Sequence, residues 1–279
     1  MKKLFIFALA LSLACTYQAQ AQDNPQEKTD LEKLNIKGSV ASVTETSGND
    51  KTVYNFNKDG MLTNISINKG KSVSGTIKFT YNDKGQLEKR EINFQRGLWF
   101  TLYAYPFNKE YAFNEGSVGS ETFKYDATGR LIERNEAIKW SGATNNYKET
   151  YKYNAKGELV NTKSSGDMAD NNYVYDVSGN MIKRFVGDID DYPTTEYKYN
   201  SKNQLISIQE SGEPPMAVEY NDMGDCIKKS GKDFDDVSFT YTYTYTYDTQ
   251  KNWTKQVSVY SDGYSKSTTT TNRIIVYNQ

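Results

Sequence analysis

Carboxylates are the first side chains to consider for acid–base chemistry, because histidine is absent from all 279 residues. Without histidine, imidazole acid–base catalysis, Ser–His or Cys–His nucleophile pairs and His-ligated metal sites are excluded. Glu133 with Glu136, and Glu158 with Asp167, have the residue types of a glycosidase pair. The distance between the carboxyl groups decides such an assignment, and pairs arise by chance among 35 acidic residues. We therefore expect a protein that is not an enzyme.

Short runs of aspartate are the candidates for metal binding, since calcium prefers oxygen ligands. One run is Asp188, Asp190 and Asp191. At a similar position in a later repeat lies a second run, Asp233, Asp235 and Asp236. Neither has the glycine and the distal glutamate of an EF-hand loop. The sequence leaves calcium binding by the first run open. We expect solvated turns there, with no metal and no cofactor.

Cys226 is the one cysteine that remains if the first 21 residues are removed, so no disulfide can form within the mature chain. It stands where comparable segments carry Leu or Met, which predicts a small buried hydrophobic residue.

An aromatic-rich segment, 94–118, is the candidate binding region, with eight aromatic residues between Phe94 and Phe113. One predicted strand within it is apolar on both faces, which requires cover on both sides. The candidate binding residues are Trp99, Phe100, Leu102, Tyr103 and Tyr105. We expect the local segment 111–118 to cover the outward face, with a partner protein, a second copy or a ligand as the alternative. The run 107–111 is expected to be a degenerate copy of the turn described next.

A repeated turn must position these residues. One turn pattern occurs eight times, with some substitutions. It has an aromatic residue, then Asn or Asp, two free residues and Gly, and a Leu or Met two positions after the Gly. The copies start 21 to 28 residues apart, except for a gap of 44 residues after Tyr81. This spacing predicts three-residue hairpin loops closed by a left-handed residue, with the Asn or Asp side chain bonding the backbone. The predicted left-handed residues are Gly60, Gly85, Gly129, Gly157, Gly179, Asn203 and Gly224. In the eighth copy, we expect Asn252 rather than Lys251 to take this role.

Strands alternate on either side of each turn. Aromatic residues and Lys or Thr follow one another with period two, most clearly from Thr240 to Tyr247. Period two places the aromatic residues on one face of a strand, which we interpret as the core face. The predicted fold is all-β: a long antiparallel meander of about eight hairpins forming one coiled sheet. Two packed sheets or a barrel-like closure are the alternatives, since a flat sheet of this size is unfavourable.

The repeat resembles the YD-repeat (Rhs-type) family. Tyr125-Asp126-Ala127-Thr128-Gly129-Arg130-Leu131 matches the Tyr-Asp-x-x-Gly-Arg-Leu pattern of that family at every fixed position. The resemblance covers roughly residues 54 to 253, with Asn in place of Asp in five copies. It implies a coiled β-sheet scaffold and a cell-wall-associated or sugar-binding role, and no catalytic residues belong to the repeat.

The N-terminus has the pattern of an export signal: two lysines, an apolar stretch from Leu4 to Ala14, and small residues at Ala19 and Ala21. We expect a signal peptide at 1–21, a disordered linker at 22–35 and the YD-repeat β-sheet domain at 36–279. Lipidation of Cys15 is the less favoured alternative. No second apolar stretch approaches membrane-spanning length.

Three functions of different class fit these observations. The leading one is a non-catalytic binding or scaffold module of the bacterial cell envelope or exterior, with a cell-surface glycan or envelope protein as partner. The second is a purely structural envelope protein without a soluble ligand. The third is an enzyme of unrecognised type. The net charge of −1 gives no long-range attraction for nucleic acid.

Overall fold

The computed structural model describes residues 29–70, 73–94, 98–104, 107–113, 117–140, 142–165, 170–187, 194–233 and 236–279. Within these ranges the chain has one short helix, α2 (Asp30–Lys33), and twenty strands. The strands are β1 (Val40–Ser47), β2 (Asp50–Phe56), β3 (Leu62–Lys69), β4 (Val73–Tyr81), β5 (Leu87–Phe94), β6 (Leu98–Ala104), β7 (Phe107–Phe113), β8 (Ser117–Tyr125), β9 (Leu131–Trp140), β10 (Ala143–Tyr153), β11 (Leu159–Ser164), β12 (Asn171–Tyr175), β13 (Met181–Val186), β14 (Thr194–Tyr199), β15 (Leu205–Glu210), β16 (Met216–Tyr220), β17 (Cys226–Lys232), β18 (Ser238–Tyr247), β19 (Trp253–Ser261) and β20 (Lys266–Tyr277).

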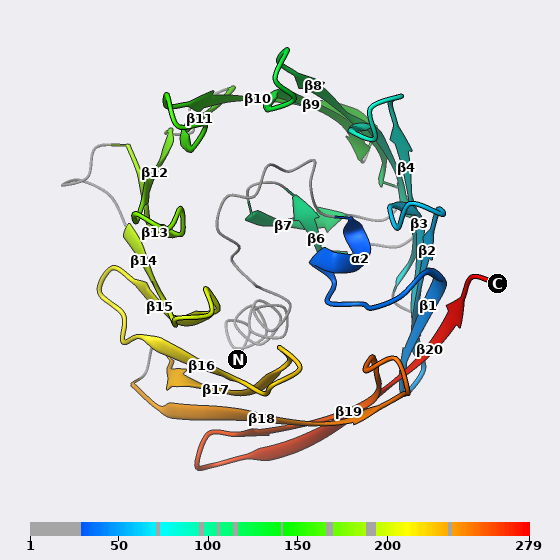
Figure 1. Cartoon of the computed structure of the whole chain (residues 1–279), viewed down its shortest axis with the longest axis vertical. Coiled ribbons are helices and arrows are strands. Elements are labelled where there is room, and N and C mark those ends of the chain that lie inside the picture. The colour runs from blue at the N-terminus through cyan, green and yellow to red at the C-terminus, as the bar shows by residue number, and fades with distance from the viewer. Residues whose placement is uncertain are drawn as a thin grey trace.

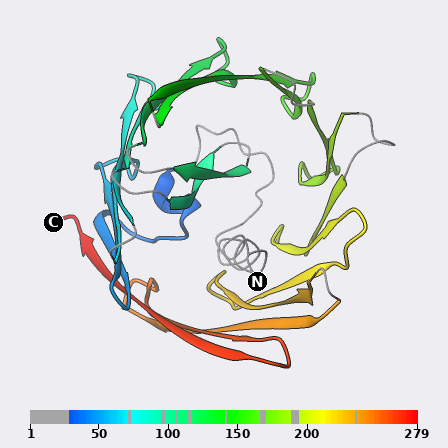
Figure 2. The same cartoon turned by 180° about the vertical axis from the view of Figure 1, so that it is seen from behind.

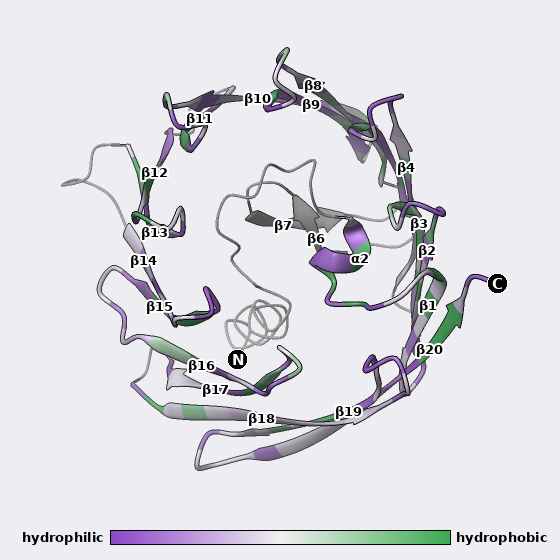
Figure 3. Cartoon of the chain, viewed as in Figure 1, coloured by the Kyte–Doolittle hydropathy of each residue, from purple (hydrophilic) through white to green (hydrophobic). Residues whose placement is uncertain are grey.

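Eight hairpin turns share one hydrogen-bond pattern, seen in the turn at Asp126. The Asp126 Oδ1 atom accepts from the backbone N–H groups of Thr128, at 2.9 Å, and Arg130, at 3.0 Å. The Gly129 N–H donates to the Asp126 carbonyl at 3.0 Å, and Gly129 has φ 90°. Figure 3 shows hydrophilic residues at such turns around the molecule. The turn is therefore built entirely from groups within five residues.

The predicted left-handed residues are confirmed. Their φ values are 78° at Gly60, 75° at Gly85, 90° at Gly129, 86° at Gly157, 81° at Gly179, 58° at Asn203 and 85° at Gly224. The eighth turn differs from the prediction, because Lys251 itself is left-handed, at φ 64°. Asn252 is 1% exposed and instead bonds the backbone of Lys37, through its Oδ1 at 2.7 Å and its Nδ2 at 2.8 Å.

The meander closes on itself. Each strand of the large sheet pairs antiparallel with its neighbours along the chain, and β1 pairs on one side with β2 and on the other with β20. The eighteen strands therefore form a ring (Figure 1). The all-β antiparallel meander is confirmed, and barrel-like closure describes it better than a single coiled sheet. Closure pairs the two edges that an open sheet would expose.

The core lies on the inner face of this ring. Leu31 of α2 packs in one cluster with Val43 and Ile65, and α2 lies inside the ring in both views (Figures 1 and 2). The tyrosine rows share this face, since Tyr151, Tyr173 and Tyr243 are buried. The prediction that the aromatic face forms the core is confirmed.

Tyrosine hydroxyls join successive repeats. In five repeats a tyrosine O–H donates to the carbonyl of the Leu, Met or Cys that follows the preceding turn. These bonds are Tyr125 to Leu87 at 2.9 Å, Tyr153 to Leu131 at 2.7 Å, Tyr199 to Met181 at 2.7 Å, Tyr220 to Leu205 at 2.9 Å and Tyr245 to Cys226 at 2.6 Å. Each of these hydrogen bonds thus links one repeat to the repeat before it.

The N-terminal part departs from the predicted disordered linker at 22–35, because residues 30–33 are helical. Thr29 and Glu32 form a capping box, which satisfies N–H groups at the helix start. The Asp30 Oδ2 atom accepts from the Leu62 N–H and the Tyr81 O–H, both at 2.8 Å. These contacts hold the helix against the first two turns.

The aromatic-rich segment contains a separate hairpin of β6 and β7, while the ring continues past it by pairing β5 with β8. The hairpin lies within the outline of the ring in both views (Figures 1 and 2). The expected degenerate turn at 107–111 is wrong, because these residues belong to β7 and pair along β6. Since Tyr111 pairs with Phe100 in register, this part of 111–118 lies beside β6 in the same hairpin.

Candidate functional site

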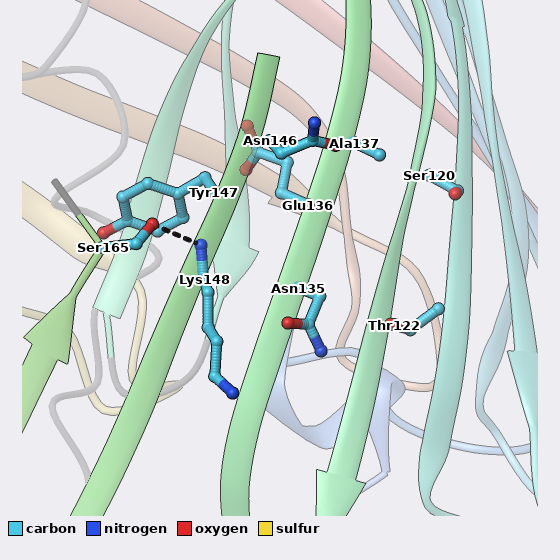
Figure 4. A pocket seen from close by; sticks show the side chains of 9 residues that line it. All are labelled: Ser120, Thr122, Asn135, Glu136, Ala137, Asn146, Tyr147, Lys148 and Ser165. Carbon is cyan, nitrogen blue, oxygen red and sulfur yellow. Dashed lines mark hydrogen bonds between the residues drawn. The ribbon is translucent and has the colours of Figure 1, made fainter. Parts of the chain in front are cut away.

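An open hollow of about 510 Å³, bordered mostly by polar residues, lies on the outer face of β8, β9 and β10; we call it the outer trough. Two rows of side chains cross these strands in register. The rows are Ser120, Ala137 and Asn146, and then Thr122, Asn135 and Lys148. Ser165 completes the lining, and Glu136 and Tyr147 border the hollow from positions whose own side chains project to the opposite face (Figure 4). The small side chain of Ala137 stands at the middle of the first row, between the two polar ones.

Strand alternation decides which side chains face the trough. Glu121 and Arg134, which neighbour the trough residues along the same strands, are buried at 0% and 3% exposure. Residues one position away must point outward, because successive side chains of a strand lie on opposite faces. The exposed Thr122 and Asn146 fit this assignment.

Several polar groups of the trough have no hydrogen-bond partner in the described ranges. Among the residues that the structure describes, no hydrogen bond involves the side chains of Ser120, Thr122 or Asn146. Ser165 closes one end, where its Oγ accepts from the Lys148 N–H at 2.9 Å (Figure 4). The trough therefore presents hydroxyl and amide groups whose hydrogen-bonding capacity the described residues do not use.

An ion network borders the trough. Glu133 accepts from the Nζ atoms of Lys124 and Lys148, each at 2.6 Å, and from the Asn135 Nδ2 at 2.9 Å. Hydrogen bonds from Asn135, Lys124 and Lys148 lower the pKa of Glu133 to about 2. Glu133 is therefore ionised at neutral pH, and its role is to fix the side chains of Asn135 and Lys148.

A buried row of charges backs the trough on the inner face. Arg90 Nε lies 2.8 Å from Glu121 Oε2, and Arg134 bridges Glu121 at 3.6 Å and Glu149 at 3.1 Å. The Tyr151 O–H donates to Glu149 at 2.6 Å. Buried pairs of this kind demand close geometry, so they fix the relative positions of β5, β8, β9 and β10.

The proposed glycosidase pair does not form one site. Glu133 and Glu136 are three residues apart on β9, and Glu136 is in register with the buried Glu121. The two carboxylates therefore project from opposite faces of the sheet. The low pKa of Glu133 also opposes a general acid role, which needs a raised pKa. In the second pair, Glu158 accepts from Asn154 in a turn, and Asp167 lies outside the described residues.

The calcium candidates yield no site in the described ranges. Asp188, Asp190 and Asp191 lie outside them. Asp233 begins a turn in which the N–H groups of Asp236 and Val237 donate to it, and Asp236 is left-handed at φ 62°. No group of three or more Cys, Asp or Glu side chains suited to a metal ion occurs among the described residues.

The other sequence candidates have different outcomes. Cys226 is fully buried, as predicted for a small hydrophobic residue. The backbone of Trp99, Phe100, Leu102 and Tyr103 forms β6, while their side chains, and Tyr105 altogether, lie outside the described part of the structure. Binding by these five residues stays a prediction.

Sequence reasoning missed the outer trough. Its signal was a set of Ser, Thr and Asn residues at outward positions of three consecutive strands. Outward polar residues are common on solvated sheets, so this signal gains meaning only from the register that aligns them.

The fold defines a class of protein, a closed shell of YD-type hairpins. Residues 93–264 match the model of the Teneurin YD-shell family. Because this match covers more than half of the chain, the chain belongs to that family. No curated protein matches the chain.

Solved structures show low sequence identity. A porin-like protein from Bacteroides uniformis is 14% identical, with 86% of this chain and 98% of that chain covered and a TM-score of 0.45. A porin-like protein from Bacteroides vulgatus is 12% identical over 86% and 98% of the two chains, with a TM-score of 0.28. The Tc holotoxin pore of Photorhabdus luminescens is 14% identical over 81% of this chain and 15% of that chain, with a TM-score of 0.36. The chain thus spans about a seventh of this last relative.

Proposed function

We propose that this shell is a non-catalytic binding scaffold of the bacterial cell envelope or exterior, and that its outer trough binds a glycan. The observation that carries the proposal is a group of hydroxyl and amide side chains in the trough, from Ser120, Thr122 and Asn146, that have no hydrogen-bond partner in the part of the chain that the structure describes. Sugars offer hydroxyl groups that can pair with such donors and acceptors. The volume of about 510 Å³ lies within the range of ligand pockets.

The rigidity of the site supports a role in ligand binding rather than in catalysis. The trough stands on three hydrogen-bonded strands that are braced from behind by buried ion pairs. A preformed site loses little entropy when a ligand binds. Its nearest carboxylate outside the buried face, Glu133, is held by three donors and is not positioned as an acid.

The export signal predicted at 1–21 supports a location outside the cytoplasm, although those residues lie outside the described ranges. Within the described residues, no helix is long and apolar enough to span a membrane.

A glycan array with the exported form tests the proposal, followed by titration calorimetry with the best ligand. Asn146→Ala and Thr122→Ala should each weaken binding by roughly threefold to tenfold, because each removes a hydrogen bond. Asn272→Ala is the matched control, since Asn272 is an exposed residue of β20, away from the trough. Absence of any glycan ligand, or equal losses in all three variants, would favour the alternative of a purely structural envelope protein.

A further inference from the structure

The extent of strand pairing differs widely where one repeat meets the next. β9 and β10 share eight register pairs, β19 and β20 share seven, and β17 and β18 share five. β15 and β16, which are neighbours in the ring (Figure 1), share two: Ser207 with Ala217 and Ile208 with Met216. Few backbone hydrogen bonds therefore hold the wall together at this contact, which we call the β15–β16 seam.

The sequence limits the seam at both ends. Pro214 and Pro215 stand directly before Met216, and proline has no N–H group that could extend the pairing past Ile208. At the other end, each of the two flanking hairpins has a β-bulge beside its turn. A bulge bends a strand and interrupts its pairing. The short seam is therefore a consequence of the residues on either side of it.

A tyrosine hydroxyl bonds across the turn end of the seam. The Tyr220 O–H donates to the Leu205 carbonyl at 2.9 Å, beyond the last register pair. The equivalent bond at the β9–β10 contact, from Tyr153 to Leu131 at 2.7 Å, adds to eight register pairs. The Tyr220 hydroxyl therefore contributes a larger share of the bonding at its own contact than the Tyr153 hydroxyl does.

The β11–β12 contact also has two register pairs, but side chains reinforce it. The Asn161 Nδ2 donates to the Asn172 Oδ1, and the hydroxyls of Thr162 and Tyr173 bond each other, both at 3.0 Å. Thr162 is buried at 0% exposure, so water cannot compete for its bond. The paired residues of the β15–β16 seam are mostly apolar, and apolar side chains cannot add such bonds.

A buried thiol lies beside the seam on the inner face. Cys226 is 0% exposed and packs in one cluster with Val218 of β16 and Tyr243 of β18. Tyr220 is in register with Cys226 and packs against the same cluster. Movement of β16 away from β15 would carry Val218 and Tyr220 with it, and so would uncover the thiol.

We propose that the wall of the ring opens locally at the β15–β16 seam, and that this opening gives small molecules a route to the aromatic inner face. Segments held by few backbone hydrogen bonds open at a lower free energy than the whole fold. Opening the seam breaks two register pairs and the Tyr220 bond, while the hairpins on either side keep five and four register pairs. The seam thus acts as a lateral gate, independent of ligand binding at the outer trough.

The rate at which Cys226 reacts tests the gate, because the thiol is covered while the seam is closed. The exported protein is labelled with N-ethylmaleimide, a small reagent, and with a bulky polyethylene-glycol maleimide. Peptide mass spectrometry follows Cys226 itself, and urea-jump kinetics give the rate of global unfolding.

Three variants change the seam or its control contact. Tyr220→Phe removes the hydroxyl that bonds across the seam, and Tyr153→Phe is the matched control, since it removes the same bond at the β9–β10 contact. Ser207→Cys combined with Ala217→Cys places two thiols in register, so that a disulfide can lock the seam. Circular dichroism checks that each variant keeps its fold.

We expect N-ethylmaleimide to label Cys226 faster than global unfolding allows, and the bulky maleimide to label it more slowly than the small one. Tyr220→Phe should raise the labelling rate by about threefold to tenfold, because one hydrogen bond of a short seam is lost. Tyr153→Phe should leave the rate unchanged, since the eight register pairs of its contact remain. The disulfide should slow labelling by about tenfold or more, because it prevents the two strands from separating.

Three outcomes would overturn the gate. If labelling of Cys226 is no faster than global unfolding, or is equally fast with the small and the bulky maleimide, the thiol is uncovered only when the whole ring unfolds. If Tyr220→Phe and Tyr153→Phe change the rate equally, the seam has no special part in the opening. If the disulfide-locked protein reacts as fast as the unlocked one, the route to Cys226 lies elsewhere in the ring.

Discussion

Substitutions at the left-handed residues of the hairpin turns can separate the energetic cost of backbone strain from the cost of tight packing. Gly157 has φ 86°, and no atom lies within 4 Å of the Cβ that a substitution would add there. Gly157→Ala should therefore lower the unfolding free energy by about 1 kcal/mol, which is the cost of holding a residue with a Cβ in the left-handed conformation.

Gly60 adds a packing cost to the same conformation. It has φ 78°, and an added Cβ would lie 3.1 Å from Leu31 Cδ1 and 3.2 Å from Thr29 Cβ. Gly60→Ala should therefore cost more, about 2 kcal/mol, since both contacts are tight and Leu31 is buried in the core. Gly157→Asn should be the mildest change, because Asn203 occupies the equivalent position at φ 58° in another repeat.

Urea unfolding followed by circular dichroism measures this order, with a constant m-value as the check that only stability changes. In thermal melts, 1 kcal/mol corresponds to about 2–4 °C for a domain of this size. Equal losses for Gly157→Ala and Gly157→Asn would refute the left-handed turn. A loss at Gly60→Ala no larger than at Gly157→Ala would refute the packing of α2 on the first turn.

Four further predictions concern the core, the tyrosines, the inner hairpin and export. Glu121→Gln should lower the unfolding free energy by about 3 kcal/mol or more, because it leaves Arg90 and Arg134 without their shared carboxylate; a loss below about 1 kcal/mol in urea unfolding would contradict this. Burial raises the pKa of Tyr125 to about 12, so the stability that its neutral form provides is present below about pH 10 and is lost as the pH rises towards 12. Absorbance at 295 nm should then show tyrosine ionisation coupled to unfolding, and independent titration near pH 10 in the folded state would contradict it. If the protein's own chain covers β6, Phe100→Asp should lower the melting temperature by several degrees. An unchanged melting temperature with lost self-association would assign that face to a second copy. If neither the melting temperature nor self-association changes, both kinds of cover are excluded. Intact mass of the exported protein should place its first residue at Gln22, and a lipid-bearing Cys15 would overturn the predicted cleavage.

The turns, the strand alternation and the inward tyrosines could be predicted from the sequence, because the interactions that form them are local. In the turn at Asp126, the side chain, the two N–H groups that it accepts from and the left-handed Gly129 all lie within five residues. The capping box of Thr29 and Glu32 was equally local, and its Thr-x-x-Glu spacing is the signal that the prediction of a disordered linker overlooked.

At Lys251, the hydrogen bonds of the turn override the preference of left-handed positions for Gly or Asn. A lysine at φ 64° is unfavourable in isolation, but the Asp248 side chain bonds the N–H groups of Gln250 and Asn252 and imposes the same turn. Asn252 is then committed to Lys37, a partner more than two hundred residues away that no local pattern reveals.

The sequence by itself thus determined the repeating hairpin, the class of fold and which side of each strand is apolar. Only the tertiary structure decided that the meander closes, since closure depends on twist accumulated over all the strands until Val40 pairs with Tyr277. It also decided the outer trough, because Ser120, Ala137 and Asn146 form one row only in the register that the intervening hairpins set. A site made of outward residues on separate strands exists only once that register is in place.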